Sequence, residues 1–383
     1  MTTQPINAGI PRKGLAMQPL QYDLCKEYIG GPAALWAEAG AAWQKYHNDP
    51  AVLTLSQALH QALVERADPE QGTAVLQQLC QAAAPGEQDI LALTALVSLL
   101  PAALRVQNAR GIPQEVQHAT FPDILIWAGD YAQRHGGKYG IDELTWLIHP
   151  YSTTIFRLGS LQYQSWPNPF PVHAYLNGTE LALFMAGDIP LAADGRVVGT
   201  NGLRQTTSSK TVFTERSGIV TGHRIDPATA TASLTPTQYN ISGGKHLLAP
   251  GQQIVMVHIP KGADLSDAAI AASRAQADRF FEQQKLPHSV FLCDSWLLDP
   301  NLKYILPPTS KVLQFARNFV TFPIKSDRAT AGRYVFRSDY TPELLSTYPA
   351  RTTLQQKMRS YLQNGNELFD IGGIMLPISP KMA

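Results

Sequence analysis

The sequence predicts an α+β protein in which an all-α N-terminal domain, residues 1–150, precedes a mixed α/β domain, residues 151–383. The chain has 383 residues, and a single domain usually has about 100 to 200. Residues 23–107 and 122–147 show helical spacing of apolar residues, whereas runs rich in β-branched residues, separated by Pro and Gly, begin only after Pro150. This change of pattern places the expected domain boundary at Pro150.

The N-terminal half has the spacing of amphipathic and buried helices. Apolar residues three and four positions apart form one face of a helix at Val52, Leu55, Leu59 and Leu63. Pro85-Gly86 interrupts the pattern, and Asp89 is expected to cap the next helix. The apolar run 90–106 contains polar residues and is shorter than the roughly 20 residues of a membrane span, so it predicts a buried helix.

The C-terminal half begins with short strands, expected at residues 153–163, 172–175 and 181–185, the last two around Asn177-Gly178. Residues 194–210 predict a surface loop, and residues 211–214 a further strand. The strongest strand prediction is 253–259, because β-branched residues dominate it. A helix follows at 267–284 with Ser266 at its N-cap, then a strand at 289–293, then a short helix opened by Asp299-Pro300. Strands joined through such a helix usually lie parallel in one sheet.

Composition narrows the function classes. Lys and Arg number 31 against 30 Asp and Glu, a balance that disfavours nucleic acid and membrane partners. Cys25, Cys80 and Cys293 form no CxxC pair, so neither a disulfide framework nor a zinc ribbon is expected. A cytoplasmic location is expected, since the N-terminus lacks the features of a signal peptide. The ten histidines show no His-x-x-x-His spacing, so no metal is expected, and nucleotide-binding and serine-hydrolase signatures are missing.

Several stretches spread over residues 120–320 are similar to those of a known family: FRLGSLQY (156–163), GHRIDP (222–227), VHIPKG (257–262) and SWLLDP (295–300). In these stretches the chain resembles a bacterial family of acyltransferase-like proteins. That family pairs a helical N-terminal acyltransferase domain with a GNAT-like C-terminal domain. The resemblance implies an acyl-CoA dependent transferase with acyl-CoA as co-substrate and an amine as acceptor, both small molecules.

The resemblance also implies a place for coenzyme A. In a GNAT-like site the loop after the fourth strand offers backbone N–H groups to the pyrophosphate at a helix N-terminus. Here these parts are residues 253–259, 260–264 and 267–284, with Val257, Ile259, Lys261 and Gly262 as the expected contacts. The loop departs from the superfamily's phosphate motif Gln/Arg-x-x-Gly-x-Gly/Ala, because it contains Pro260 and is followed by Asp264 and Asp267. Two interpretations stay open: carboxylates that favour a helix start, or an altered phosphate site.

Four side chains are candidates for proton transfer. His258 and His223 have the unperturbed imidazole pKa that suits a general base, but a structural histidine is the favoured interpretation of each. Glu215 is a candidate carboxylate base or an exposed edge-strand charge. Tyr304 follows the 289–293 strand, where GNAT-like enzymes often carry a tyrosine that protonates the leaving thiolate, or it packs on the sheet. Cys293 is interpreted as a small buried residue rather than a nucleophile.

Two function hypotheses of different classes follow. The first is an N-acyltransferase in which an amine attacks the thioester directly, with backbone N–H groups near residues 257–259 polarising the carbonyl. The second is a GNAT-shaped ligand-binding or regulatory module without transferase activity, which the altered loop favours. Separation of the 253–259 and 289–293 strands is expected for the first hypothesis, and continuous pairing would weaken it.

Overall fold

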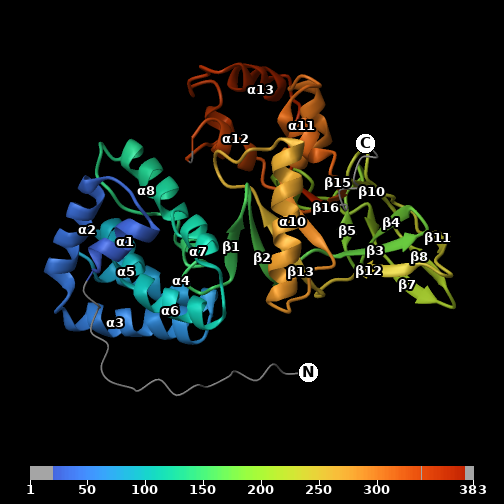
Figure 1. Cartoon of the computed structure of the whole chain (residues 1–383). Coiled ribbons are helices and arrows are strands. Elements are labelled where there is room, and N and C mark those ends of the chain that lie inside the picture. Colours follow the sequence, from blue (N-terminus) through green and yellow to red (C-terminus); the bar gives the residue numbers. More distant parts are fainter. Residues whose placement is uncertain (1–19, 338, 376–383) are drawn as a thin grey trace. The chain divides into compact units, whose positions relative to one another are not determined.

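The structure, a computed structural model, describes residues 20–337 and 339–375. The chain divides into two compact units, Met1–Arg157 and Leu158–Ala383, and each is described by itself. The first unit is helical and the second is built around sheets (Figure 1), so the predicted α+β class is confirmed. The chain passes from one unit to the other within strand β1 (Ile155–Leu158).

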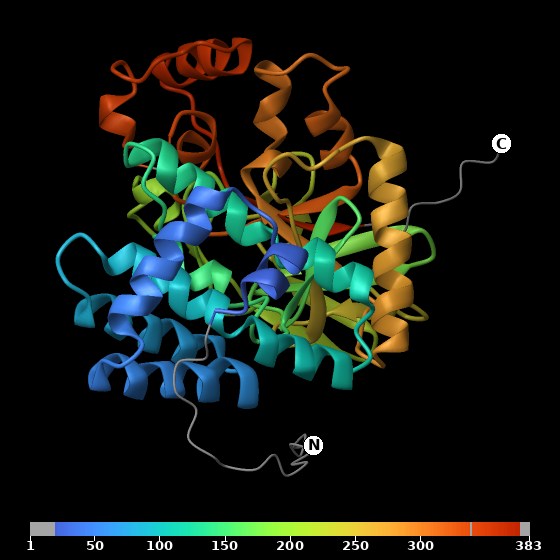
Figure 2. The same cartoon turned by 60° about the vertical axis from the view of Figure 1, so that its left-hand side comes forward.

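Short helices make up the first unit, shown in blue to teal in Figure 2. The predicted helical stretch 23–107 is divided by turns at Gly30-Gly31, Asn48 and Pro85-Gly86. A π-helical turn, Gln61–Glu65, extends the third helix. The helices are α1 (Tyr22–Tyr28), α2 (Ala33–Tyr46), α3 (Pro50–His60), α4 (Pro69–Ala82), α5 (Gln88–Ser98), α6 (Leu100–Ala109), α7 (Gln114–Thr120), α8 (Asp123–Arg134) and α9 (Leu144–Leu147).

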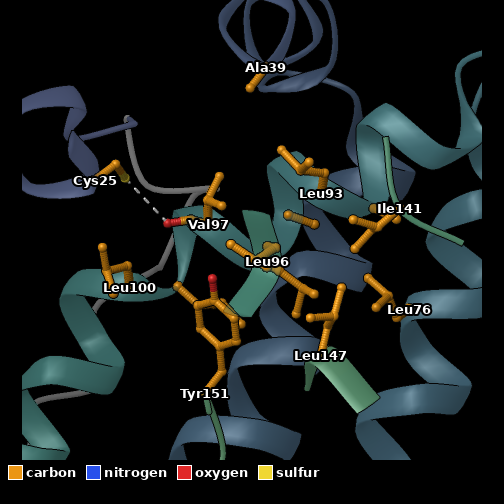
Figure 3. Packing of buried hydrophobic residues seen from close by; sticks show 14 of the residues in the cluster. Cys25, Ala39, Leu76, Leu93, Leu96, Val97, Leu100, Ile141, Leu147 and Tyr151 are labelled. Atoms are coloured by element: carbon orange, nitrogen blue, oxygen red, sulfur yellow. Dashed lines mark hydrogen bonds between the residues drawn. The ribbon is translucent and has the colours of Figure 1, made fainter. Parts of the chain in front are cut away.

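Helix α5 is the centre of the first unit's core. Every residue from Leu91 to Ser98 is buried, and Leu96 lies among side chains from the surrounding helices (Figure 3). By length and composition Gln88–Ala109 resembles a membrane span, but 78% of its most apolar window is buried inside the unit, as predicted for a buried helix. The expected cap was wrong: Asp89 lies inside the first turn, where its carboxylate accepts a hydrogen bond from the Tyr131 hydroxyl (2.7 Å).

The second unit contains a six-stranded sheet in the order β1-β2-β13-β14-β16-β15. Strand β13 pairs antiparallel with β2 and parallel with β14, which confirms the predicted parallel pair. The last strands of the chain, β16 and β15, extend the sheet beyond β14 and were not predicted. The bounds are β2 (Leu161–Pro167), β13 (Gln253–His258), β14 (Phe291–Ser295), β15 (Phe319–Pro323) and β16 (Ile371–Met375).

Small sheets fill the interval between β2 and β13. The predicted strand 153–163 is two strands, because Gly159 (φ +68°) turns the chain between β1 and β2. The sequence did not predict the five short strands between residues 219 and 248. The sheets are β12-β3-β4 (Lys245–Leu248, Val172–Asn177, Glu180–Met185), β11-β8-β7 (Thr237–Asn240, Ile219–Gly222, Phe213–Arg216), β10-β9 (Thr231–Ala232, Ile225–Asp226) and β5-β6 (Pro190–Leu191, Ser209–Lys210).

Helix α10 (Asp267–Gln283) lies against one face of the six-stranded sheet (Figure 1). The Phe281 ring meets Phe291 of β14 edge-on, and the Arg274 guanidinium lies over the same Phe291 ring at 3.6 Å. The opposite face of the sheet carries Ile254, Met256 and Leu292, which belong to a separate buried cluster with residues of the β12-β3-β4 sheet. Alternation along each strand therefore assigns odd positions of β13 and β14 to the α10 face and even positions to the other.

Further helical segments follow β14. They are the 3-10 turns η3 (Trp296–Leu298) and η4 (Pro300–Tyr304), then α11 (Lys311–Ala316), α12 (Thr330–Val335), the 3-10 turn η5 (Pro342–Leu344) and α13 (Thr353–Gln363); η2 (Thr200–Gly202) lies earlier in the chain. The predicted cap at Asp299 is confirmed, because its carboxylate accepts from the Asn301 N–H (2.9 Å).

Candidate functional site

Strands β13 and β14 separate near the middle of the sheet. Their paired residues are Val255 with Phe291 and Met256 with Leu292, and the register ends there. Both strands continue, but each stays with its other neighbour: β13 pairs with β2 as far as His258, and β14 pairs with β16 as far as Ser295. The expected splay is therefore present, and it begins directly after Met256.

The edge of β13 that faces the gap carries backbone donors. The Val255 N–H donates to the Val290 carbonyl (3.0 Å), so amides at odd positions point toward β14. Val257 directly follows Met256, which is in the last pair of the ladder, and Ile259 lies two residues further on. Two of the four predicted cofactor contacts, Val257 and Ile259, thus lie where the strands separate.

The loop from β13 to α10 contains a carboxylate, Asp264, close to the N-terminus of the helix. The Asp264 carboxylate accepts from the Ser266 N–H (3.0 Å) and from the Ser266 hydroxyl (2.9 Å). The Lys311 ammonium lies 3.0 Å from Asp264 and holds the pKa of that carboxyl below its ordinary value. Ser266 occupies the predicted N-cap position, but its hydroxyl bonds Asp264 instead of capping the helix. Asp264 therefore uses a donor that a phosphate would otherwise take, as the altered loop suggested.

Lys261 and Gly262, the other two predicted cofactor contacts, are exposed in this loop. Gly262 adopts a left-handed conformation (φ +80°), and nothing lies within 4 Å of the position that a Cβ would take. The loop therefore leaves open space on the side of Gly262 that faces away from its own backbone.

His258 shares the even face of β13 with Ile254 and Met256, as predicted. One ring nitrogen, Nε2, lies 3.2 Å from Oε1 of Gln164 on β2. The side chain is half-buried at the end of the strand, next to the separation of β13 and β14. Of the four predicted catalytic side chains, His258 is the one placed on the edge of the gap.

The structure does not bring Glu215 and His223 into the six-stranded sheet. Glu215 lies on β7 of the β11-β8-β7 sheet, where its carboxylate accepts from the Tyr175 hydroxyl (2.6 Å). His223 follows β8 and is 1% exposed, and its Nδ1 is 2.8 Å from the Ser233 carbonyl oxygen. The expected partner Asp226 bonds Ala228 and Thr229 instead. His223 thus closes a loop, the structural alternative considered for it.

Tyr304 ends the 3-10 turn η4 and is 67% exposed, so it neither packs on the sheet nor lies in its interior. Its ring is parallel to that of Tyr361, with centroids 6.4 Å apart. Both rings line an open groove of about 660 Å³. The other lining residues are Asn301, Gly365, Asn366, Glu367 and Phe369.

Cys293 is not a nucleophile in this fold. Its side chain is 1% exposed on the α10 face of β14, and burial raises the pKa of its thiol well above the ordinary value. A thiolate is the reactive form of cysteine, so this thiol stays inert. Within residues 20–337 and 339–375, no group of three or more His, Cys, Asp or Glu side chains is arranged to hold a metal ion.

Asp294 is the residue at this site that the sequence did not single out. It follows Cys293 on β14, pairs with Gly372 of β16, and is exposed although its neighbours Leu292 and Cys293 are buried. The sequence signal was present: a carboxylate directly after a buried apolar strand stands at the strand's carboxyl end, where ligands bind in α/β sheets.

Two family profiles match the chain in tandem. Residues 22–153 match the N-acyltransferase N-terminal domain, and residues 155–375 match the GNAT-like C-terminal domain. A comparison with curated protein sequences found no match.

Solved structures share the fold over nearly the whole chain. An acyltransferase in complex with decanoyl-CoA and teicoplanin is 18% identical, with a TM-score of 0.60, and the match covers 98% of this chain and 91% of that one. An acyltransferase with decanoyl-CoA is 19% identical, with a TM-score of 0.60 and coverage of 96% and 91%. A mutant acyltransferase with octanoyl-CoA is 18% identical, with a TM-score of 0.59 and coverage of 93% and 87%.

Proposed function

The chain belongs to the family in which an N-acyltransferase N-terminal domain precedes a GNAT-like C-terminal domain, and from this we propose that it is an acyl-CoA dependent N-acyltransferase. The observation that carries the proposal is the separation of β13 and β14 after Met256 and Leu292. A parallel pair that opens at its carboxyl end makes a slot in which a thioester can lie between the two strands. Ligands of open α/β sheets bind at this end of the strands.

Backbone amides on the open edge of β13 would polarise the thioester carbonyl. The Ile259 N–H lies past the last pair and points to the β14 side, so a carbonyl oxygen in the slot would accept from it. Donors fixed in advance stabilise the oxyanion of a tetrahedral intermediate without reorganisation, and losing one typically lowers kcat by about 10²–10³. The amine then attacks the thioester directly, because the inert Cys293 offers no acyl-enzyme route.

The phosphates of coenzyme A would meet an unusual loop. Gly262 and Lys261 are exposed beside α10, whereas the Ser266 N–H is already bonded to Asp264. The phosphates would therefore rely more on cationic side chains and less on the helix N-terminus than in a loop with free amides. We expect weaker binding of coenzyme A at high salt as a consequence.

Binding and turnover of acyl-CoA test this proposal. The solved neighbours hold octanoyl- and decanoyl-CoA, so these are the first donors to use, with a panel of small primary amines as acceptors. Thermal unfolding with decanoyl-CoA at 100 times its Kd should show a stabilisation of about 2.7 kcal/mol. Release of free coenzyme A should then depend on the amine. A chain that neither binds octanoyl-, decanoyl- or acetyl-CoA nor releases the thiol would contradict the proposal.

The second function, a ligand-binding or regulatory module, is favoured by one observation, the Asp264 carboxylate at the start of α10. The same experiment separates the two functions. Binding of decanoyl-CoA without thiol release in the presence of any amine would support the module.

A further inference from the structure

Asp294 lies on β14, the strand that forms one side of the gap, and β13 forms the other side. It lies two residues beyond Leu292, the last residue of β14 that pairs with β13, and stays in the sheet through its pairing with Gly372. The strand residues before it, Phe291 to Cys293, are buried, whereas Asp294 is exposed. Its exposure shows that the face of the sheet is uncovered at this point, next to the end of the pairing between β13 and β14.

Asp294 and His258 lie on the same face, on opposite sides of the gap. Even positions of both strands point away from α10, as Met256 and Leu292 do. Continuing the register from the pair Met256 and Leu292 by two residues leads to His258 and Asp294. The separation of the strands thus opens between these two side chains, and Gln164 holds the imidazole in place.

Asp294 is exposed but has apolar groups on the side of its neighbour β16. Its neighbour Gly372 has no side chain, and the ring of the buried Phe322 fills that space, since a Cβ on Gly372 would lie 2.1 Å from the ring. Within the described part of the chain, the Asp294 carboxylate makes no hydrogen bond or ion pair with another side chain. Desolvation raises its pKa above the ordinary value. Asp370, the nearby like charge, has its pKa raised to about 6, mainly by burial and in smaller part by Asp294.

We propose that Asp294 is the general base of the acyl transfer and accepts the proton of the attacking amine. This inference rests on the proposed function. The amine nitrogen forms a bond to the thioester carbon and passes one proton to the Asp294 carboxylate. The C–S bond then breaks, the sulfur leaves as the thiolate of coenzyme A, and the carboxylic acid returns the proton to that sulfur or to water. His258, on the other side of the gap, contacts the acceptor and orients it.

The test compares two nucleophiles with different proton affinities. An alkylamine is protonated at pH 7 and depends on a base, whereas hydroxylamine is largely unprotonated at that pH and depends on a base much less. Asp294→Asn should lower kcat with the alkylamine by about 10²–10⁴, the usual contribution of a general base. With hydroxylamine kcat should fall less than tenfold, and the Kd for decanoyl-CoA should stay within twofold. Asp294→Glu, which keeps the carboxylate, should recover at least a tenth of the alkylamine rate.

Two further variants serve as comparisons. Asp188→Asn removes a carboxylate whose side chain is 87% exposed and should change none of these quantities. His258→Gln should lower both rates alike, because orientation matters to either nucleophile.

Equal losses with both nucleophiles, or an Asp294→Asn variant as active as the natural chain, would overturn the role of Asp294 alone. A natural chain that binds decanoyl-CoA and transfers nothing to either nucleophile would overturn the proposed function and this inference with it. If Asp294→Asn is inactive and its circular dichroism is altered, Asp294→Glu decides the question. A correctly folded Asp294→Glu variant that does not recover the alkylamine rate also counts against the inference.

Discussion

Replacing Ser273 by Ala should loosen helix α10 from the sheet that carries the site. Ser273 is 0% exposed on the sheet-facing side of α10. Its hydroxyl lies 2.9 Å from the Tyr163 hydroxyl, donates to the Leu158 carbonyl, and is reached by the Leu161 N–H at 3.3 Å. One oxygen thus connects the helix to the hairpin of β1 and β2 at a position that solvent does not reach.

The magnitude follows from the groups left without a partner. A buried polar group that loses its hydrogen bond costs about 1–3 kcal/mol. Tyr163 is 0% exposed, so its hydroxyl cannot bond to solvent instead. The Leu158 carbonyl and the Leu161 N–H each lose a hydrogen bond as well. We expect Ser273→Ala to lower the free energy of unfolding by about 3 kcal/mol, which lowers the melting temperature of a unit of this size by roughly 6–12 °C.

Calorimetry and urea unfolding of the full chain measure the effect, with the transition of the second unit followed separately. Ser360→Ala, at an exposed position on α13, is the control and should change stability by no more than about 0.5 kcal/mol. The double variant Ser273→Ala/Tyr163→Phe should lose less stability than the two single variants together, because the second change removes the Tyr163 hydroxyl that Ser273→Ala leaves without a hydrogen bond. A Ser273→Ala loss below 0.5 kcal/mol, or strict additivity, would refute the reasoning.

Three further predictions concern the second unit. Burial raises the pKa of Asp299 to about 6 from the ordinary 3.8, so its stabilising contribution, about 3 kcal/mol, is complete below pH 3.8 and is lost as the pH rises through 6. In urea unfolding between pH 4 and 7, the stability of Asp299→Ala should therefore change less with pH than that of the natural chain. An equal change with pH in both would contradict this. Gly372→Ala should destabilise by about 1–3 kcal/mol because its Cβ meets Phe322, whereas Gly129→Ala, a helical position with nothing within 4 Å, should stabilise slightly, and equal melting temperatures would count against the packing argument. Asp264→Asn should tighten coenzyme A binding roughly fivefold at low salt, because it removes a negative charge beside the phosphates. Calorimetric titration measures this, with S-decanoyl-pantetheine, which lacks the nucleotide, as the control. Weaker binding of coenzyme A would show that the phosphates lie elsewhere.

The strands and helices predicted best were those whose pattern is local. Residues 253–259 and 267–284 were found nearly to their ends, because β-branched alternation, a proline stop and a long amphipathic run all agreed there. Strands β8 to β12 have only two to four residues each, and β11 is exposed on both faces, so the sequence has little alternation by which to detect them. Strand β16 was missed for a different reason: its two glycines weaken its strand propensity, and tertiary packing of Phe322 over Gly372 compensates for this.

The sequence places His258, Ile259 and the loop that follows close together, because one strand and one loop carry them. Their roles in the site stay predictions. Glu215 and His223 were plausible by residue type, yet the fold places them in another sheet and in a closed turn. Their chemistry is local, but their neighbours are set by pairings of strands far apart in the chain.

The sequence by itself determined the α+β class, the helical first part, the parallel order of β13 and β14, and, through VHIPKG and SWLLDP, the resemblance to acyltransferases. These follow from short-range patterns of side chains, which the backbone expresses locally. Only the tertiary structure decided where β13 leaves β14, that Asp264 bonds the N–H and hydroxyl of Ser266 before α10, and that Asp294 follows the last pair across from His258. The physical reason is that β13 stays paired with β2, and β14 with β16, beyond the point where β13 and β14 separate. Both β2 and β16 are distant in sequence from the strands with which they pair.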